Sequence, residues 1–143
     1  MEGAGPMTPF RLTIISPDGP EFEGNVEELI VRTTSGDVGI LAGHINCVAP
    51  LGMGRATILT DAGKRFGACI GGMVSVMDGK VTLLATSFEW ADQIDVERAE
   101  KSEDRARKVL DNKSASDTDI RLAEARLKRA LVRKSVAVSY KER

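Results

Sequence analysis

Ile94-Asp95-Val96-Glu97-Arg98-Ala99 marks the boundary between two parts of this chain of 143 residues. All fourteen glycines and all five prolines precede it, so only the first part is rich in the residues that break regular elements. Asp95 can accept hydrogen bonds from the free amides of a first helical turn, and Ile94 and Ala99 occupy the two positions of a hydrophobic staple. The stretch therefore predicts strands and turns before it and helices after it.

Before the boundary, apolar residues alternate with other residues at the period of two that is typical of half-buried strands. The alternating positions are Phe10, Leu12 and Ile14; Leu29 and Val31; Phe66, Ala68 and Ile70; and Val81, Leu83 and Ala85. Asp78-Gly79 lies between two such runs and is a strong hairpin signal, because both positions must accept positive φ. No helical segment interrupts the region, so the crossovers of a parallel sheet are missing. We predict an antiparallel β-sandwich or flattened barrel as an N-terminal domain over residues 8–90.

The segment Gly36–His44 contains three glycines in nine residues, which indicates tight backbone turns or the close approach of another chain. It lacks the Gly-Lys-Ser/Thr ending and the following helix of a phosphate-binding loop. His44 is the only histidine, and no Ser/Asp or metal-ligand pattern surrounds it. We interpret the segment as a surface loop and expect no catalytic residue and no metal site.

The two parts of the chain carry opposite net charge. Residues 1–93 hold 6 Lys/Arg and 11 Asp/Glu, whereas residues 94–143 hold 14 and 10. Cys47 and Cys69 lack a zinc-ligand spacing and are expected to be buried free thiols in a reducing compartment. No run reaches the roughly eighteen apolar residues of a membrane span. Residues 1–6 do not begin a secretory signal, and Met7 is an alternative start.

After the boundary, the spacing of apolar residues predicts two helices, over about Val96–Leu110 and Asp117–Val138. A polar turn joins them, and Ser116 or Asp117 is the expected N-cap of the second helix. The apolar stripe is mostly Ala and Val. This helical hairpin, placed at residues 94–140, should therefore bury little surface and attach weakly to the sandwich.

Arginines recur on the polar faces of both helices. If the helices pack antiparallel, the guanidinium groups of Arg98, Arg129 and Arg133 converge beside Asp95 and could bind a polyphosphate in bidentate fashion. The alternative is a solvated basic face held by i,i+4 pairs. Nucleic acid is a poorer partner, because this half offers almost no aromatic platform on which bases could stack.

Three motifs in this order resemble those of the epsilon subunits of bacterial and chloroplast F-type ATP synthases. They are Gly36-x-x-Gly39-Ile40-Leu41-x-Gly43-His44, Ile94-Asp95-x-x-Arg98-Ala99 and Leu127-Lys128-Arg129-Ala130. The resemblance extends from about Phe10 to Ala137. It implies a β-sandwich of about ten strands followed by two antiparallel helices. It also implies a non-catalytic rotor subunit of a proton-translocating enzyme.

The resemblance further implies the partners and the location of the chain. The sandwich would contact the gamma subunit and the ring of c subunits, and Gly39, Leu41, Gly43 and His44 are the candidate contact loop. The hairpin would fold onto the sandwich or extend toward the alpha and beta subunits and inhibit ATP hydrolysis. Membrane association would be indirect, at the cytoplasmic face of the bacterial inner membrane.

Some members of that family bind ATP at the folded hairpin. The matching positions here are Glu89, Asp95, Arg98, Arg129 and Arg133. ATP is thus a possible regulatory ligand, and no cofactor is required. The alternative function is a free-standing small protein that senses nucleotide.

Overall fold

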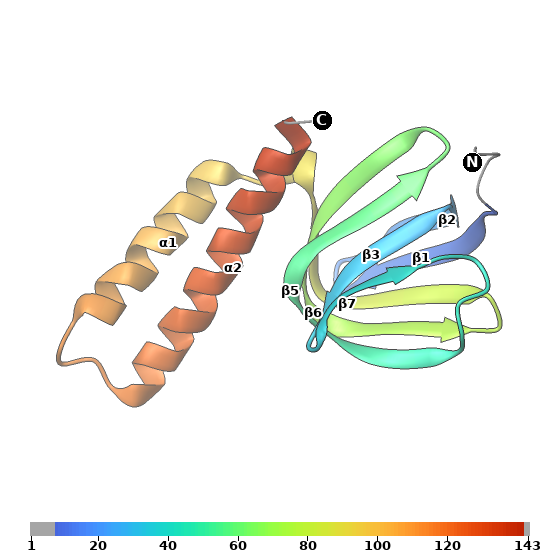
Figure 1. Ribbon diagram of the computed structural model, residues 1–143. Helices are drawn as coiled ribbons and strands as arrows, with labels where there is room; N and C mark the ends of the chain where they lie inside the picture. The colour runs from blue at the N-terminus through green and yellow to red at the C-terminus, as the bar shows by residue number, and fades with distance from the viewer. Residues whose placement is uncertain (1–7, 142–143) are drawn as a thin grey trace.

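A computed structural model describes residues 8–141, which form a folded β-sheet followed by a helical hairpin (Figure 1). The sheet order is β2-β1-β7-β6-β5-β3-β4. The strands are β1 (Phe10–Ser16), β2 (Gly19–Val26), β3 (Glu28–Thr33), β4 (Gly36–Ile40), β5 (Cys47–Thr60), β6 (Gly63–Met77) and β7 (Lys80–Trp90). Buried apolar side chains fill the space inside the folded sheet, among them Leu12, Leu29 and Ile58. The predicted sandwich is confirmed.

The part of the chain that the structure describes contains seven strands rather than about ten. The number is lower because β5 and β6, of 14 and 15 residues, are long strands that bend and continue, as Figure 1 shows. Gly71 and Gly72 lie within β6 and have φ of +68° and +115°. A Cβ atom at Gly72 would collide with the carbonyl oxygen of Leu84, so this close approach of β6 and β7 requires glycine.

One strand pair contradicts the prediction of a purely antiparallel sheet. β1 and β7 are parallel, with Leu12 opposite Val81 and Ile14 opposite Leu83, whereas the other five pairings are antiparallel. A parallel pair needs a long connection between its strands. Here strands β2 to β6 supply that connection, so a search for helical crossovers overlooks it.

The glycine-rich segment 36–44 is a loop only in its second half. Residues 36–40 form β4, an edge strand whose Ile40 is buried opposite Leu29 of β3. Gly36 and Gly43 take the positive φ that the sequence indicates, whereas Gly39 does not. The Asp78-Gly79 hairpin is confirmed, since these residues have φ of 50° and 82°.

Both helices begin where the capping signals place them. After a 3₁₀ turn, η1 (Ala91–Gln93), helix α1 covers Val96–Asp111 and helix α2 covers Asp117–Lys141. The amide of Arg98 donates to Asp95 Oδ1 at 3.0 Å, and the amide of Asp119 donates to Ser116 Oγ at 3.1 Å. The N-cap role of Asp95 is confirmed, and Ser116 caps α2. No helix in the described range 8–141 is long and apolar enough to cross a membrane.

A seam of buried alanines joins the two helices. The seam consists of Ala99 and Ala106 on α1 and Ala123, Ala130 and Ala137 on α2. Glu103 reinforces it, because its carboxylate contacts Lys134 Nζ of the other helix at 2.8 Å and Arg107 at 2.9 Å. Small residues and one ion-pair cluster thus hold the hairpin together, as the thin apolar stripe predicts.

The hairpin packs on the sandwich near the end of α2. Val136 is 1% exposed and lies in a cluster with Ala68 of β6 and Ala91 of η1, flanked by Phe66 and Ile94. This contact explains why Ala68 and Cys69 are both buried: Cys69 belongs to the sandwich core, and Ala68 belongs to the cluster with Val136. Burial raises the pKa of the Cys69 thiol to about 12. Cys47 is also a free thiol but is only half-buried.

Candidate functional site

Four of the five residues predicted to bind ATP meet at the head of the hairpin. A cleft of about 90 Å³ lies between the end of β7 and the two helices. It is lined by Glu89 of β7, the helix cap Asp95, Arg98 and Ala99 of α1, and Arg133 of α2. We call it the junction cleft. Its residues come from three elements, so the cleft exists only when the hairpin lies against the sandwich.

An ion pair crosses the junction cleft. Arg133 Nε lies 2.6 Å from Glu89 Oε1, and about a third of each side chain is exposed (31% and 33%). Both atoms are buried, and each has the other as its charged partner. The pair therefore links the end of β7 to α2 across the cleft.

Asp95 and Arg98 form the α1 wall of the cleft. One oxygen of Asp95 is used as the helix cap by accepting from the Arg98 amide. That amide is therefore not available to a phosphate, although the start of a helix favours negative charge. The Arg98 side chain is exposed and can reach an anion from this wall.

Arg129 is not among the residues that line the junction cleft. It is half-buried one turn before Arg133 on α2. Measured around the helix axis, Arg133 lies about 60° from the seam residue Ala130 and Arg129 about 100° on the same side. Arg129 thus points farther from the seam than the prediction supposes.

A second hollow of about 280 Å³ continues from the cleft along α1. Its residues are Asp95, Glu97, Arg98, Lys101 and Arg105. Lys101 and Arg105 are site residues that the prediction leaves out, although Arg105 follows Arg98 by seven residues and hence lies on the same helix face. Lys101 is 3.4 Å from Glu97, a pair that is largely exposed. The hollow is larger than the cleft and gives an elongated anion more room.

The candidate contact loop lies at the opposite end of the sandwich from the helices (Figure 1). Asn46 fastens it to the β6–β7 turn, because its side chain accepts from the Asp78 amide at 2.8 Å and donates to the Asp78 carboxylate at 3.3 Å. Large apolar side chains are exposed here: Leu41 (45%), Ile45 (76%), Val48 (56%) and Met77 (52%). We call these four residues the sandwich tip. Of these four residues, only Leu41 was predicted from the sequence. Ile45, Val48 and Met77 are apolar residues in or beside turns, and this position in the sequence is the signal that could have identified them.

The other predicted loop residues have structural surroundings. Gly39 belongs to β4, and the exposed turn contains Gly43. His44 Nδ1 lies 2.9 Å from the carbonyl oxygen of Ile45 and 3.9 Å from Cys47 Sγ. No group of three or more potential metal ligands gathers within the described residues. The junction cleft therefore suits an anion, and the sandwich tip suits another protein.

Comparisons with known proteins match both parts of the chain. Residues 9–91 match the family model of the ATP synthase delta/epsilon chain β-sandwich domain, and residues 92–137 match that of its long α-helix domain. The ATP synthase epsilon chain of Bacillus velezensis is 44% identical over 131 residues, which cover 92% of this chain and 98% of that protein. That of Ruminococcus albus is 46% identical over 132 residues, with the same shares.

Two solved structures share the fold. A chain of the Euglena gracilis mitochondrial ATP synthase assembly of OSCP, F1 and c-ring aligns with a TM-score of 0.78 and 23% identity, over 99% of this chain and 86% of that one. A chain of the Tetrahymena thermophila mitochondrial ATP synthase central stalk and c-ring aligns with a TM-score of 0.66 and 13% identity, over 92% of this chain and 98% of that one.

Proposed function

This chain belongs to the ATP synthase delta/epsilon-chain family, and we propose that it is the epsilon-type, non-catalytic subunit of a bacterial F-type ATP synthase. It takes part in the rotor of the complex, where the sandwich binds the gamma subunit and the c ring. The hairpin reaches the alpha and beta subunits when it extends. The subunit is held at the cytoplasmic face of the membrane by these partners.

The sandwich tip supports the assignment of partners to that end of the molecule. Single exposed apolar residues are ordinary on protein surfaces, whereas a gathering of them indicates an interface. Ile45 is the most exposed member at 76%, and the Asn46–Asp78 hydrogen bonds hold the neighbouring backbone in place. A partner can therefore bury Ile45 without having to order a loose loop.

Co-purification from membranes tests this interface. We expect Ile45→Asp to reduce recovery of the gamma and c subunits with the tagged chain, because binding would bury a charge. Leu122→Asp is the matched control, since Leu122 is 61% exposed on the hairpin. Equal recovery with both variants would rule out the tip as the contact. A wild-type chain that brings down no other subunit would favour the free-standing nucleotide sensor.

The hairpin has the properties of a movable regulator. Its attachment to the sandwich consists of a small apolar cluster around Val136, the Glu89–Arg133 ion pair and the Arg55–Ser139 hydrogen bond. Burying a side chain such as that of Val136 contributes about 1.5–3 kcal/mol, so the docked and extended states can differ by only a few kcal/mol. An extended hairpin presents its basic surface to acidic surfaces of the catalytic head and inhibits hydrolysis.

We propose ATP as the ligand that selects the docked hairpin. The observation that carries this proposal is the meeting of β7, α1 and α2 at the junction cleft. The volume of about 90 Å³ admits part of a nucleotide, and the hollow of about 280 Å³ along α1 accommodates the rest. The two sets of lining residues share Asp95 and Arg98, so one ligand can contact both.

The residues present fit such a ligand. Arg98 and Arg133 serve as phosphate ligands, and Arg129 joins them if its side chain turns toward the cleft. Asp95 has a second oxygen that can accept from the amino group of a base. Glu89 is a further polar contact and is the ion partner of Arg133. Bound ATP then links the sandwich to both helices, so inhibition is released when ATP is plentiful.

Calorimetric titration of ATP into the full chain tests the site. We expect saturable heat, a loss of affinity of roughly tenfold or more in Arg98→Gln and Arg133→Gln, and little change in Arg126→Gln. Arg126 is a suitable control because it lies on α2 beside a separate hollow at the hairpin tip. If millimolar ATP gives no heat and no change in thermal stability, Asp95 and Arg98 serve only to start the helix, and the nucleotide role falls.

A further inference from the structure

A cavity of about 500 Å³ lies between the sandwich and α2, away from the junction cleft. Strands β3, β4 and β5 form one wall and α2 forms the other, through residues 128–136. None of its lining residues belongs to the junction cleft or to the sandwich tip. We call it the sandwich–α2 groove. Its volume falls in the range of about 300–1,000 Å³ that is usual for small-molecule sites.

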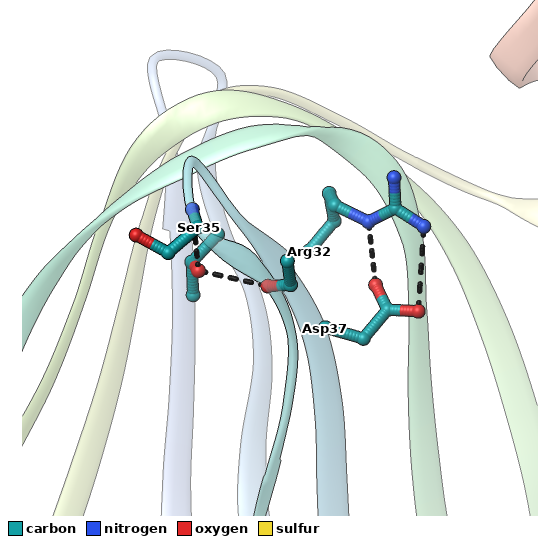
Figure 2. Close-up of polar contacts among 5 residues, drawn as sticks. Arg32, Ser35 and Asp37 are labelled. Atoms are coloured by element: carbon teal, nitrogen blue, oxygen red, sulfur yellow. Dashed lines mark hydrogen bonds and ion pairs between the residues drawn. The ribbon is translucent and has the colours of Figure 1, made fainter.

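An ion pair with about half of each side chain exposed lies on the sandwich wall of the groove. Figure 2 shows the Arg32 guanidinium facing the Asp37 carboxylate, with Nε to Oδ1 at 2.6 Å and Nη2 to Oδ2 at 3.3 Å. The Arg32 guanidinium lowers the pKa of Asp37, and the nearby Arg55 contributes in the same direction. Asp37 is thus charged at neutral pH and holds Arg32 in position. One carboxylate therefore lies beside two guanidinium groups.

Arg55 is also held in place. Its Nη1 donates to Ser139 Oγ of α2 at 2.9 Å, and its Cζ lies 5.0 Å from the centre of the Phe66 ring. Lys128 adds a third cation from the helical wall. Three cations and one carboxylate leave the groove with a positive excess that favours an anion.

Apolar side chains form a smaller patch within this mainly polar groove. Ile30 and Met53 lie on the sandwich side, and Leu131 and Val132 lie on α2. Leu131 is 41% exposed, although it stands beside the groove cations. An apolar patch beside placed charges suits a small organic molecule that carries both an acidic group and an aliphatic part.

We propose that the sandwich–α2 groove binds an amphiphilic organic anion, with one acidic group and an aliphatic body, such as a medium-chain fatty acid. The acidic group pairs with Arg55 and with the donors of Arg32 that Asp37 leaves free. The aliphatic body covers Leu131 and Met53. Because the walls belong to the sandwich and to the hairpin, the ligand binds the docked hairpin and opposes its extension. This regulation depends on the proposed hairpin movement, whereas binding to the isolated chain does not.

Titration with decanoate below its micelle-forming concentration tests the groove, read by amide NMR shifts and by thermal stability. We expect shifts in β3, β5 and the second half of α2, together with a raised midpoint of thermal unfolding. Affinity should fall roughly tenfold or more in Arg55→Gln, and less in Lys128→Gln, because a guanidinium group can pair with a carboxylate through two hydrogen bonds whereas an ammonium group acts as a point charge. Decanol, which lacks the charge, should bind at least tenfold more weakly than decanoate.

Three variants separate the possible causes of a loss of decanoate affinity. Ser139→Ala removes the hydrogen bond that links Arg55 to α2 but leaves the cation, so it should weaken decanoate binding less than Arg55→Gln does. Lys113→Gln, in the exposed turn between the helices, controls for net charge. Arg133→Gln should lose ATP but keep decanoate, so the two sites can fail separately. Equal binding of decanol and decanoate, or unchanged affinity in Arg55→Gln, would overturn the proposal.

Discussion

Val136 is the buried hairpin side chain in the apolar contact with the sandwich. Val136→Ala should weaken docking of the hairpin without unfolding the sandwich. The residue is 1% exposed and packs with Ala68 and Ala91. The substitution removes two buried methyl groups at about 0.8 kcal/mol each and leaves a small cavity. A loss of about 1.5–2.5 kcal/mol follows, which shifts the ratio of docked to undocked hairpin by about 10- to 60-fold.

Hydrogen exchange in the last three turns of α2 measures this shift, because the undocked end of the helix is free to open. Val138→Ala is the matched control, since Val138 is 50% exposed two residues further along the same helix. Alanine has the higher helix propensity, so faster exchange in Val136→Ala cannot come from a weaker helix. Equal exchange in the two variants would refute the idea that Val136 anchors the hairpin.

Three other predictions concern the inhibition of ATP hydrolysis by the hairpin, the stability of the hairpin at low pH, and the close approach of β6 and β7 at Gly72. Deleting the residues after Trp90 should raise ATP hydrolysis by the reconstituted complex while the stalk stays assembled; unchanged hydrolysis would show that the hairpin is only structural. Lys134 and Arg107 lower the pKa of Glu103 from its ordinary 4.5. The ion pairs of Glu103 therefore stabilise the hairpin fully above pH 4.5, and this stabilisation is lost as the pH falls through the lowered pKa. Glu103→Gln should remove this acid dependence of hairpin unfolding. Gly72→Ala should destabilise the sandwich by about 2 kcal/mol or more in denaturant titration, because φ is +115° and the added methyl group would meet the carbonyl oxygen of Leu84. Gly39→Ala is the control and should be nearly neutral, because a methyl group there makes only ordinary contacts. Similar unfolding midpoints for the two variants would contradict the close approach of β6 and β7 at Gly72.

Local signals in the sequence predict the junction between the two parts well. An N-cap acts within one helical turn, so Asp95 and the change of period place the start of α1, and Ser116 does the same for α2. Asp78-Gly79 likewise specifies its own turn. These features need no knowledge of distant residues.

Pairings between distant segments were beyond such signals. The parallel β1–β7 pair joins the two ends of the sandwich, and no local pattern distinguishes it from an antiparallel pair. Strand β4 contains two glycines in five residues, so its period-two pattern is weak.

The candidate site divides in the same way. The convergence of Arg98 and Arg133 follows from antiparallel packing, but the absence of Arg129 from the cleft depends on which helix face the alanine seam occupies. The sandwich–α2 groove brings β3 and β5 close to α2 across roughly 70 to 105 residues of sequence, which no spacing argument reaches.

The alanine seam also bears on how fast the hairpin can change state. Alanine side chains are short, so the two helices can shift or separate from each other with little repacking of neighbouring side chains. Helix and domain movements of this kind occur in microseconds to milliseconds, whereas enzymes commonly complete about 1 to 1,000 turnovers per second. The hairpin can therefore sample its positions several times within one catalytic cycle, and the strength of inhibition would report the time-averaged occupancy of the inhibiting position.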